Sequence, residues 1–345
     1  MKIVGIGDLL IPANMIEKGF QNFVARGSTI KTVNWQQDSY EELQHINLQV
    51  ETNGSEVYDV PDEIIAVIKD ADIIITQFCP VSRKVIDACK NLKIIGVLRS
   101  GYENINVDYA TEKGILVYNT PGRNATAVAD FTVGLLICEC RNIAKSHMNM
   151  KNGHWVRDYT NAAVVPDLSE KTVGIIGLGQ VGQKVAQRLH GFEMKIVGYD
   201  PYIKEVPDYI NLASLKEVAQ NADFLTIHTR LNKETERMIN ADFLRLIKPG
   251  AYFINTARSG LVDEKALYEA LLSKKLIGAA LDVFDVEPPP KEYPLLTLPN
   301  VTVTPHLAGG TVDAFLNSPK LLSKEMIKYL DGEMSKFIVN KYVNI

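Results

Sequence analysis

The stretch VGIIGLGQVGQKVAQRL, residues 173–189, contains an apolar run, three glycines in the dinucleotide-binding spacing and an amphipathic run. Gly177, Gly179 and Gly182 form the G-x-G-x-x-G pattern that follows a strand and opens a helix. The first glycine permits a tight turn, the second lets backbone approach a pyrophosphate, and the third allows the helix to pack closely on the strand. The stretch therefore predicts a phosphate site at the positive end of a helix.

An acidic residue completes this fingerprint. The predicted strand KIVGY, 195–199, runs into Asp200, where a carboxylate accepts hydrogen bonds from the ribose hydroxyls of the cofactor. The same carboxylate repels a 2′-phosphate, and the following Pro201 and Tyr202 supply no arginine to receive one. We therefore predict NAD, rather than NADP, as the cofactor.

From residue 172 onward, short apolar runs alternate with amphipathic stretches, as in a parallel sheet with crossover helices. This pattern predicts the six strands of a complete dinucleotide-binding sheet. They are 172–176, 195–199, 224–228, 251–255, 277–283 and 301–304.

The first part of the chain alternates in the same way and predicts a second, smaller α/β domain. Its expected strands are 2–6, 72–76, 92–97 and 115–118. Residues 125–143 are predicted to form one long helix, and 321–333 a helix near the end.

Composition narrows the possible partners. The 345 residues favour two domains, and 37 basic against 41 acidic side chains, without long runs of one sign, argue against a nucleic-acid or membrane-surface protein. Four irregularly spaced cysteines do not form a disulfide framework, and the start lacks a signal-peptide pattern. The histidines do not assemble a metal-ligand spacing. We expect a soluble cytoplasmic protein that binds a small molecule, with no metal.

Candidate catalytic residues follow the later strands, because ligands bind beyond the carboxyl ends of strands in an open α/β sheet. Arg258 follows the fourth predicted strand of this sheet, Asp282 lies at the end of the fifth, Glu287 follows the fifth, and His306 follows the sixth. Reduction of a 2-oxo acid requires a cation for the carboxylate, a proton donor for the developing alkoxide, and a group that keeps the donor protonated. Arg258, His306 and Glu287 suit these roles.

With these residues in place, the chain resembles the D-isomer-specific 2-hydroxyacid dehydrogenase family, which includes phosphoglycerate, glyoxylate, hydroxypyruvate and D-lactate enzymes. The likeness covers nearly the whole chain. It is carried by GLGQVG with Asp200, NTARSGLVDE, ALDVFDVEP, TPHLAGGT, SGYENINVD (100–108) and NATAVADFTVGLL (124–136).

The resemblance implies a Rossmann-type doubly wound NAD domain, 119–308, inserted into a flavodoxin-like substrate domain of residues 1–118 and 309–345. The family places its active site in the cleft and pairs through the NAD domain, which implies a homodimer. The catalytic Arg, Glu and His of the family fall on Arg258, Glu287 and His306. By the same likeness, substrate-binding residues are Ser100, Gly101, Asn104 and Phe78, and cofactor-binding residues are Gly177, Gly179, Gln180, Val181, Gly182, Asp200, Thr229, Thr256, Ala257 and Asp282.

Two departures from the family pattern are of unknown role: Asp130 replaces a usual Glu, and Arg230 replaces a usual Pro after His228. Arg230 is expected to face solvent. The alternative enzyme is a D-3-phosphoglycerate dehydrogenase, which the loop ITQFCPVS, 75–82, disfavours because it lacks the basic residues that bind a phosphate. An alternative of another class is an NAD-sensing scaffold that resembles a transcriptional corepressor, which the intact catalytic set disfavours.

Overall fold

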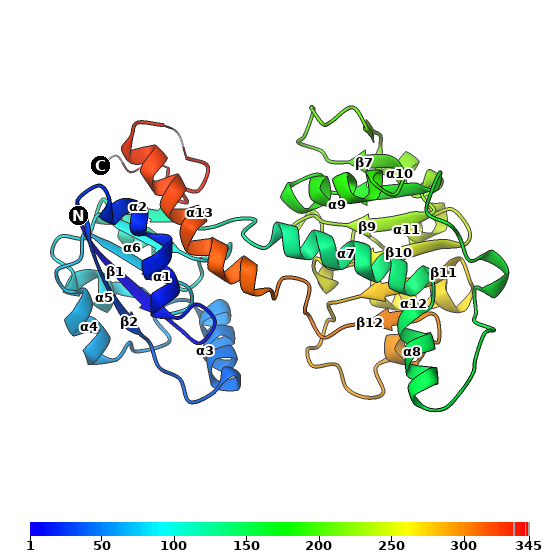
Figure 1. Ribbon diagram of the computed structural model, residues 1–345, viewed down its shortest axis with the longest axis horizontal. Helices are drawn as coiled ribbons and strands as arrows, with labels where there is room; N and C mark the ends of the chain where they lie inside the picture. The colour runs from blue at the N-terminus through cyan, green and yellow to red at the C-terminus, as the bar shows by residue number, and fades with distance from the viewer. Residues whose placement is uncertain (334, 342, 344–345) are drawn as a thin grey trace. The chain divides into compact units, whose positions relative to one another are not determined.

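The computed structural model describes residues 1–333, 335–341 and 343, and the chain forms two compact units (Figure 1). The first unit comprises Met1–Arg123 and Thr311–Ile345, and the second comprises Asn124–Gly310. The chain passes from one unit to the other at 123/124 and at 310/311, a few residues beyond the boundaries expected at 118 and 308. Residues after 118 stay with the first unit because the Thr120 hydroxyl donates to the Val97 carbonyl at 2.8 Å.

The first unit is built on a parallel sheet with the strand order β2-β1-β3-β4-β5. This is the flavodoxin-like order, which reverses direction between β1 and β3. All four expected strands are present, and β2 was missed because it is an edge strand of alternating exposed and half-buried residues, without an apolar run. The strands are β1 (Lys2–Gly7), β2 (Thr29–Asn34), β3 (Ile73–Thr76), β4 (Ile94–Val97) and β5 (Leu116–Tyr118).

Helix α13 (Val312–Leu330) returns the end of the chain to the first unit, where Figure 1 shows it beside α1 (Ala13–Gly19). A Cβ on Gly19 would lie 2.3 Å from Pro319 Cβ, so glycine permits this close packing. The predicted helix 321–333 is the second half of α13, which begins nine residues earlier and ends at Leu330. The other helices of this unit are α2 (Gln21–Val24), α3 (Tyr40–Asn53), α4 (Asp62–Ile68), α5 (Arg83–Ala88) and α6 (Val107–Glu112).

The second unit contains a parallel sheet in the order β12-β11-β10-β9-β6-β7-β8, which is doubly wound about β6 and β9. The six predicted strands are present. The prediction of six in total is wrong, because β8 adds a three-residue edge strand with two exposed residues, too short to give a pattern. The strands are β6 (Thr172–Ile176), β7 (Lys195–Tyr199), β8 (Ile210–Leu212), β9 (Phe224–Ile227), β10 (Ala251–Asn255), β11 (Leu276–Leu281) and β12 (Val301–Val303).

The single helix predicted over 125–143 is wrong. Helix α7 (Ala125–Cys140) ends earlier because Asn142 adopts a left-handed φ of 56°, with its Nδ2 donating to Asn161 Oδ1 at 2.7 Å. Helix α8 (Ile143–Lys151) begins after this break. Apolar side chains of α7 and α9 (Gln180–His190) cover one face of the sheet, and those of α10 (Leu215–Asn221), α11 (Ala241–Leu246) and α12 (Glu264–Leu272) cover the other.

Among the described residues, no helix combines the length and apolar character needed to cross a membrane.

Candidate active site

The glycine turn after β6 has the three steric roles predicted for it. Gly177 has a φ of 91°, and a Cβ there would lie 2.8 Å from the Thr229 amide nitrogen. A Cβ on Gly182 would lie 2.0 Å from the Gly177 carbonyl oxygen, so α9 could not pack as it does. A Cβ on Gly179 would meet no atom within 4 Å, so this stretch of backbone is open to a ligand. The turn therefore fits a pyrophosphate at the start of α9.

Asp200 lies against this turn. Its Oδ2 accepts a hydrogen bond from the Leu178 amide at 2.9 Å, and its Oδ1 accepts from the amides of Tyr202 at 2.9 Å and Ile203 at 3.2 Å. A carboxylate has about four acceptor positions, so capacity remains for ribose hydroxyls. Both the open glycine and this acceptor fit NAD. Gln180 is the exposed first residue of α9. The next residue, Val181, is half-buried and packs against the apolar cluster that α7 and α9 form with the sheet.

His306 and Glu287 form a hydrogen-bonded pair. The Nδ1 atom of His306 lies 2.8 Å from Glu287 Oε2, and both side chains are partly exposed. The second carboxylate oxygen, Oε1, accepts the Phe284 amide at 3.0 Å and so orients the glutamate. With Nδ1 bonded to the carboxylate, Nε2 is the ring nitrogen left to exchange a proton with a ligand.

Asp282 organises the loop that carries His306. Its carboxylate is fully buried, and Oδ1 accepts from the Thr304 hydroxyl at 2.5 Å and the Leu307 amide at 2.9 Å. Oδ2 accepts from the Ala308 amide at 2.8 Å. The structure thus gives Asp282, predicted to contact the cofactor, three bonds to the loop around His306.

Arg258 lies on the loop after β10, with an exposed side chain. Its Nη1 donates to the Ala257 carbonyl at 2.6 Å, and within the described chain this is the guanidinium's one hydrogen bond. The loop is shaped by the buried Asn255, which donates to the Arg258 carbonyl at 2.8 Å and accepts from the Ala257 amide at 3.0 Å. The free part of the guanidinium can bind a carboxylate.

Thr256 directs its hydroxyl toward α7. Its Oγ1 lies 2.8 Å from Thr132 Oγ1, and the Thr132 hydroxyl in turn donates to the Val128 carbonyl at 2.7 Å. Since a hydroxyl has one hydrogen, Thr256 is the donor to Thr132. The Thr256 hydroxyl can therefore contact NAD only as an acceptor, and its backbone supplies any donor.

The four predicted substrate-binding residues lie together in the first unit. Among the described residues, the amides of Ser100 and Gly101 donate no hydrogen bond, so both are available to an anion. Asn104 is fully buried, and its Nδ2 donates to the carbonyls of Gln77 at 3.3 Å and Cys79 at 3.2 Å, which fixes this loop to the exit of β3. The Phe78 ring lies 5.1 Å below the Arg99 guanidinium.

Sequence reasoning missed the residues that support the site. Asn255 and Thr132 hold the Arg258 loop, and Thr304 helps hold the His306 loop. A polar residue directly after a buried strand, as Asn255 is within NTARSG, was an available signal. Asp130 pairs with Arg188 and so joins α7 to α9, whereas the exposed Arg230 accepts the Thr235 hydroxyl through its carbonyl at 2.6 Å.

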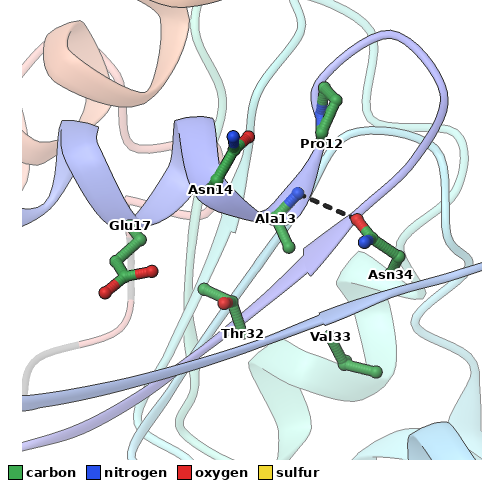
Figure 2. Close-up of a pocket in the computed structure, with 7 residues that line it drawn as sticks. All are labelled: Pro12, Ala13, Asn14, Glu17, Thr32, Val33 and Asn34. Atoms are coloured by element: carbon green, nitrogen blue, oxygen red, sulfur yellow. Dashed lines mark hydrogen bonds between the residues drawn. The ribbon is translucent and has the colours of Figure 1, made fainter.

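A surface pocket of about 460 Å³ lies elsewhere, between α1 and β2 (Figure 2). One of its polar side chains is already used, because Asn34 Oδ1 accepts the Ala13 amide at 2.9 Å. None of the candidate catalytic residues lines it. Among the described residues, no group of three or more His, Cys, Asp or Glu side chains could hold a metal ion.

A family model described as "D-isomer specific 2-hydroxyacid dehydrogenase, NAD binding domain" matches residues 133–308, just over half of the chain. The chain belongs to the D-isomer specific 2-hydroxyacid dehydrogenase family. The matched segment is nearly the whole second unit, which is therefore the NAD-binding domain of this dehydrogenase, and its cofactor is NAD.

Relatives of this dehydrogenase differ in length. The D-3-phosphoglycerate dehydrogenase of Methanocaldococcus jannaschii is 42% identical over 81% of this chain, but the chain spans only 53% of that protein. The hydroxypyruvate reductase of Thermotoga maritima is 40% identical over 73% of this chain and 83% of that protein. The structure of a D-lactate dehydrogenase with NAD⁺ from Lactobacillus jensenii matches with a TM-score of 0.73 and 27% identity, over 98% of this chain and 99% of that one.

Proposed function

We propose that this protein interconverts a small 2-oxo acid and the corresponding D-2-hydroxy acid, with His306, Glu287 and Arg258 as catalytic residues. The observation that carries the proposal is the 2.8 Å contact of His306 Nδ1 with Glu287, on a loop held by Asp282. This arrangement leaves Nε2 of a fixed imidazole as a proton donor.

The reduction needs one hydride and one proton. NADH, when bound, supplies the hydride to the carbonyl carbon. His306 gives its Nε2 proton to the carbonyl oxygen as that oxygen becomes an alkoxide, and Glu287 stabilises the imidazolium before transfer. In the oxidative direction, neutral His306 takes the proton from the hydroxyl group. Glu287 thus acts through His306, as the carboxylate that stabilises the protonated ring.

Arg258 binds the substrate carboxylate and polarises the carbonyl group. Support comes from its nearly unused guanidinium fork at the carboxyl edge of the second sheet. We propose that the free amides of Ser100 and Gly101 also hold the carboxylate, with the first unit as substrate domain. For NAD, we propose contacts from the glycine turn, Asp200 and Thr229, with Thr256 and Ala257 toward the nicotinamide. Asp282, which the sequence also placed at the cofactor, is proposed instead to orient the His306 loop.

The substrate is proposed to be a small unphosphorylated acid such as glyoxylate or hydroxypyruvate. A hydroxypyruvate reductase relative that this chain largely covers supports this choice. D-3-phosphoglycerate is the second candidate, favoured by the 42% identity to an enzyme of that name. Against it, the first-unit loop 75–82 has no basic residue that could pair with a phosphate.

We propose a cytoplasmic homodimer that pairs through the second unit. Support comes from large apolar side chains exposed on α8 and the segment after it, a surface more apolar than a monomer usually leaves in water. They include Ile143, Met148, Met150, Trp155 and Val164, of which Trp155 is 78% exposed. The four cysteines are free thiols, which supports a reducing compartment.

The test is NADH oxidation with glyoxylate, hydroxypyruvate, pyruvate and 3-phosphohydroxypyruvate. We expect turnover of an unphosphorylated acid, and His306→Gln should reduce kcat at least about 100-fold with little change in NADH affinity. Arg258→Ala should raise KM for the acid and also lower kcat, because Arg258 both binds the carboxylate and polarises the carbonyl group. Unchanged turnover in His306→Gln would refute the assignment, and NAD binding without turnover of any acid would favour a scaffold role.

A further inference from the structure

The first unit has its own topological switch point, between β1 and β3. The two strands are paired in parallel with Ile6 opposite Thr76, so the chain leaves them side by side at Asp8 and Phe78. In open α/β sheets, ligands bind at such a point, beyond the carboxyl ends of the strands. The polar side chains at this edge can therefore contact a ligand.

Asp8 is buried there with one half of its carboxylate unused. The side chain is 4% exposed, and Oδ1 accepts the amides of Leu10 and Ile11, each at 2.9 Å. Oδ2 is buried and has no hydrogen-bond partner among the described residues. Burial raises the pKa of Asp8 to about 6, against the lowering effects of those two amides, of the Arg123 charge and of the Phe78 backbone amide. A buried acceptor without a partner is costly, so this oxygen is suited to receive a donor from a ligand.

Arg123 is the complementary donor. Its guanidinium stacks 5.1 Å from the Phe315 ring of α13, and Nη1 is buried without a hydrogen-bond partner in the described chain. Burial and the charge of Arg99 lower the pKa of Arg123 to about 10, while the charge of Asp8 opposes the shift. Arg123 and Asp8 thus attract each other, but within the described residues they form no ion pair.

The other nearby cation, Arg99, is fully committed to the protein. Its Nη2 lies 2.8 Å from Glu51 Oε1 and 2.6 Å from Glu103 Oε2, and Nη1 donates to Asn47 Oδ1 at 2.6 Å. Two carboxylates neutralise it, so it offers little charge to a ligand. The Asp8 acceptor and the Arg123 donor are thus the charged groups at this edge that lack a hydrogen-bond partner among the described residues. The neutral side-chain amide of Gln77 and Asn104 Oδ1 are buried there without partners as well.

We propose that Asp8 and Arg123 bind a hydroxyl group on the carbon chain of the substrate and so select a hydroxylated 2-oxo acid. This inference rests on the proposed function, which assigns substrate binding to the first unit. A hydroxyl donates its hydrogen to Asp8 Oδ2 and accepts one from Arg123 Nη1, which satisfies both buried groups.

The pair discriminates against close analogues for distinct reasons. A methyl group, as in pyruvate, leaves both polar groups unpaired, and sites of this kind reject analogues that lack the hydroxyl. A phosphate carries acceptors and negative charge, so it meets Arg123 but is repelled by Asp8. Hydroxypyruvate, reduced to D-glycerate, is the three-carbon acid that satisfies the pair.

The test compares wild type with Asp8→Asn, which keeps the shape of the side chain but turns an acceptor toward the ligand into a donor. In wild type we expect kcat/KM for hydroxypyruvate to exceed that for pyruvate. In Asp8→Asn this ratio should fall about 10- to 100-fold, because the hydroxyl group of hydroxypyruvate loses its acceptor. The relative rate with 3-phosphohydroxypyruvate should rise. Asp72→Asn is the matched control, because Asp72 accepts the Lys2 amide at the opposite edge of the same sheet.

Calorimetric binding of D-glycerate and D-lactate to the NAD⁺-loaded protein supplies a readout independent of turnover. We expect tighter binding of D-glycerate in wild type and loss of that preference in Asp8→Asn and Arg123→Met. Equal kcat/KM for hydroxypyruvate and pyruvate in wild type, or an unchanged preference in Asp8→Asn, overturns the subsite while leaving the dehydrogenase function intact. If no acid is turned over, the proposed function fails, and the calorimetric preference still decides whether the subsite exists.

Discussion

The carboxylate of Asp282 accepts the backbone amide of Ala308 at 2.8 Å and thereby fixes the loop on which His306 lies. His306 has a φ of 53°, a left-handed conformation that costs a residue with a side chain about 1–3 kcal/mol. The bonds from Leu307 and Thr304 to the same buried carboxylate hold the loop in that conformation. Asp282 therefore acts on the proton donor through the backbone.

Asp282→Asn should lower kcat while leaving NADH affinity nearly unchanged. The amide nitrogen that replaces one oxygen is a donor facing donors, so the loop loses at least one of its three bonds. We expect a loss of about 10- to 100-fold in kcat, the range for an outer residue that orients a reacting group. The measurement is kcat together with the NADH dissociation constant from fluorescence. A fall in NADH affinity by the same factor would instead show that Asp282 contacts the cofactor.

Asp200→Ala should weaken NAD binding and narrow the preference for NAD over NADP. The substitution removes both the ribose acceptor and the bond to the Leu178 amide that supports the glycine turn. We expect NAD affinity to fall about tenfold or more, with a smaller loss for NADP because repulsion of its 2′-phosphate also disappears. Dissociation constants for both cofactors provide the measurement.

Asp208→Ala is the matched control, an exposed acid in the same loop region. A wild-type protein that binds NADP as tightly as NAD would contradict the selective role of Asp200.

The sequence predicted both sheets and the motif positions because buried parallel strands are continuous apolar runs and glycine turns have fixed spacing. It missed β2 and β8, which lie at sheet edges and lack such runs. It also ran α7 and α8 together, because the turn at Asn142 depends on a contact with Asn161, a residue distant in sequence. Boundary errors thus follow from tertiary contacts.

The same limit applies to the site. Glu287 and His306 each follow a predicted parallel strand, which placed them at the same edge of the sheet. The structure shows them in contact. The Asp8 oxygen, which lacks a partner among the described residues, and the nearby charge of Arg123 could not be predicted. The two residues lie 115 positions apart, and neither belongs to a sequence motif. Burial and missing partners are properties of the folded chain.

His228 should make the folded state less stable at acid pH. Burial of the ring lowers the pKa of His228 to about 3. Among the described residues, Nδ1 is enclosed without a hydrogen-bond partner, and Nε2 lies 3.0 Å from Thr226 Oγ1. The unfolded chain, with an ordinary pKa near 6.5, binds the proton first, so stability is lost as pH falls from about 6.5 toward 3. In His228→Gln the free energy of unfolding should fall less over this window in urea titrations.

Asp8 contributes with the opposite sign. Its pKa is raised from 3.8 to about 6, so the folded state holds the proton longer, and this contribution is lost as pH rises from about 4 to 6. Urea titrations of Asp8→Asn separate the two effects. An equal pH slope in wild type and His228→Gln would contradict burial of a neutral imidazole.

Two glycines of the turn should respond differently to alanine. A Cβ on Gly182 would lie 2.0 Å from a backbone oxygen, so Gly182→Ala forces α9 away from the strand and should cost about 1–3 kcal/mol of stability. Gly179 has an ordinary φ of −67° and open space, so Gly179→Ala should fold with nearly wild-type stability.

Gly179→Ala should nevertheless bind NADH at least about tenfold more weakly, because its methyl group occupies the place where the pyrophosphate approaches the backbone. Thermal unfolding and NADH titration of both variants give the comparison. Each variant is the control for the other, since they lie three residues apart in one turn. Wild-type NADH affinity in Gly179→Ala would show that the cofactor does not pass over this glycine, and the open backbone would then need another ligand to explain it.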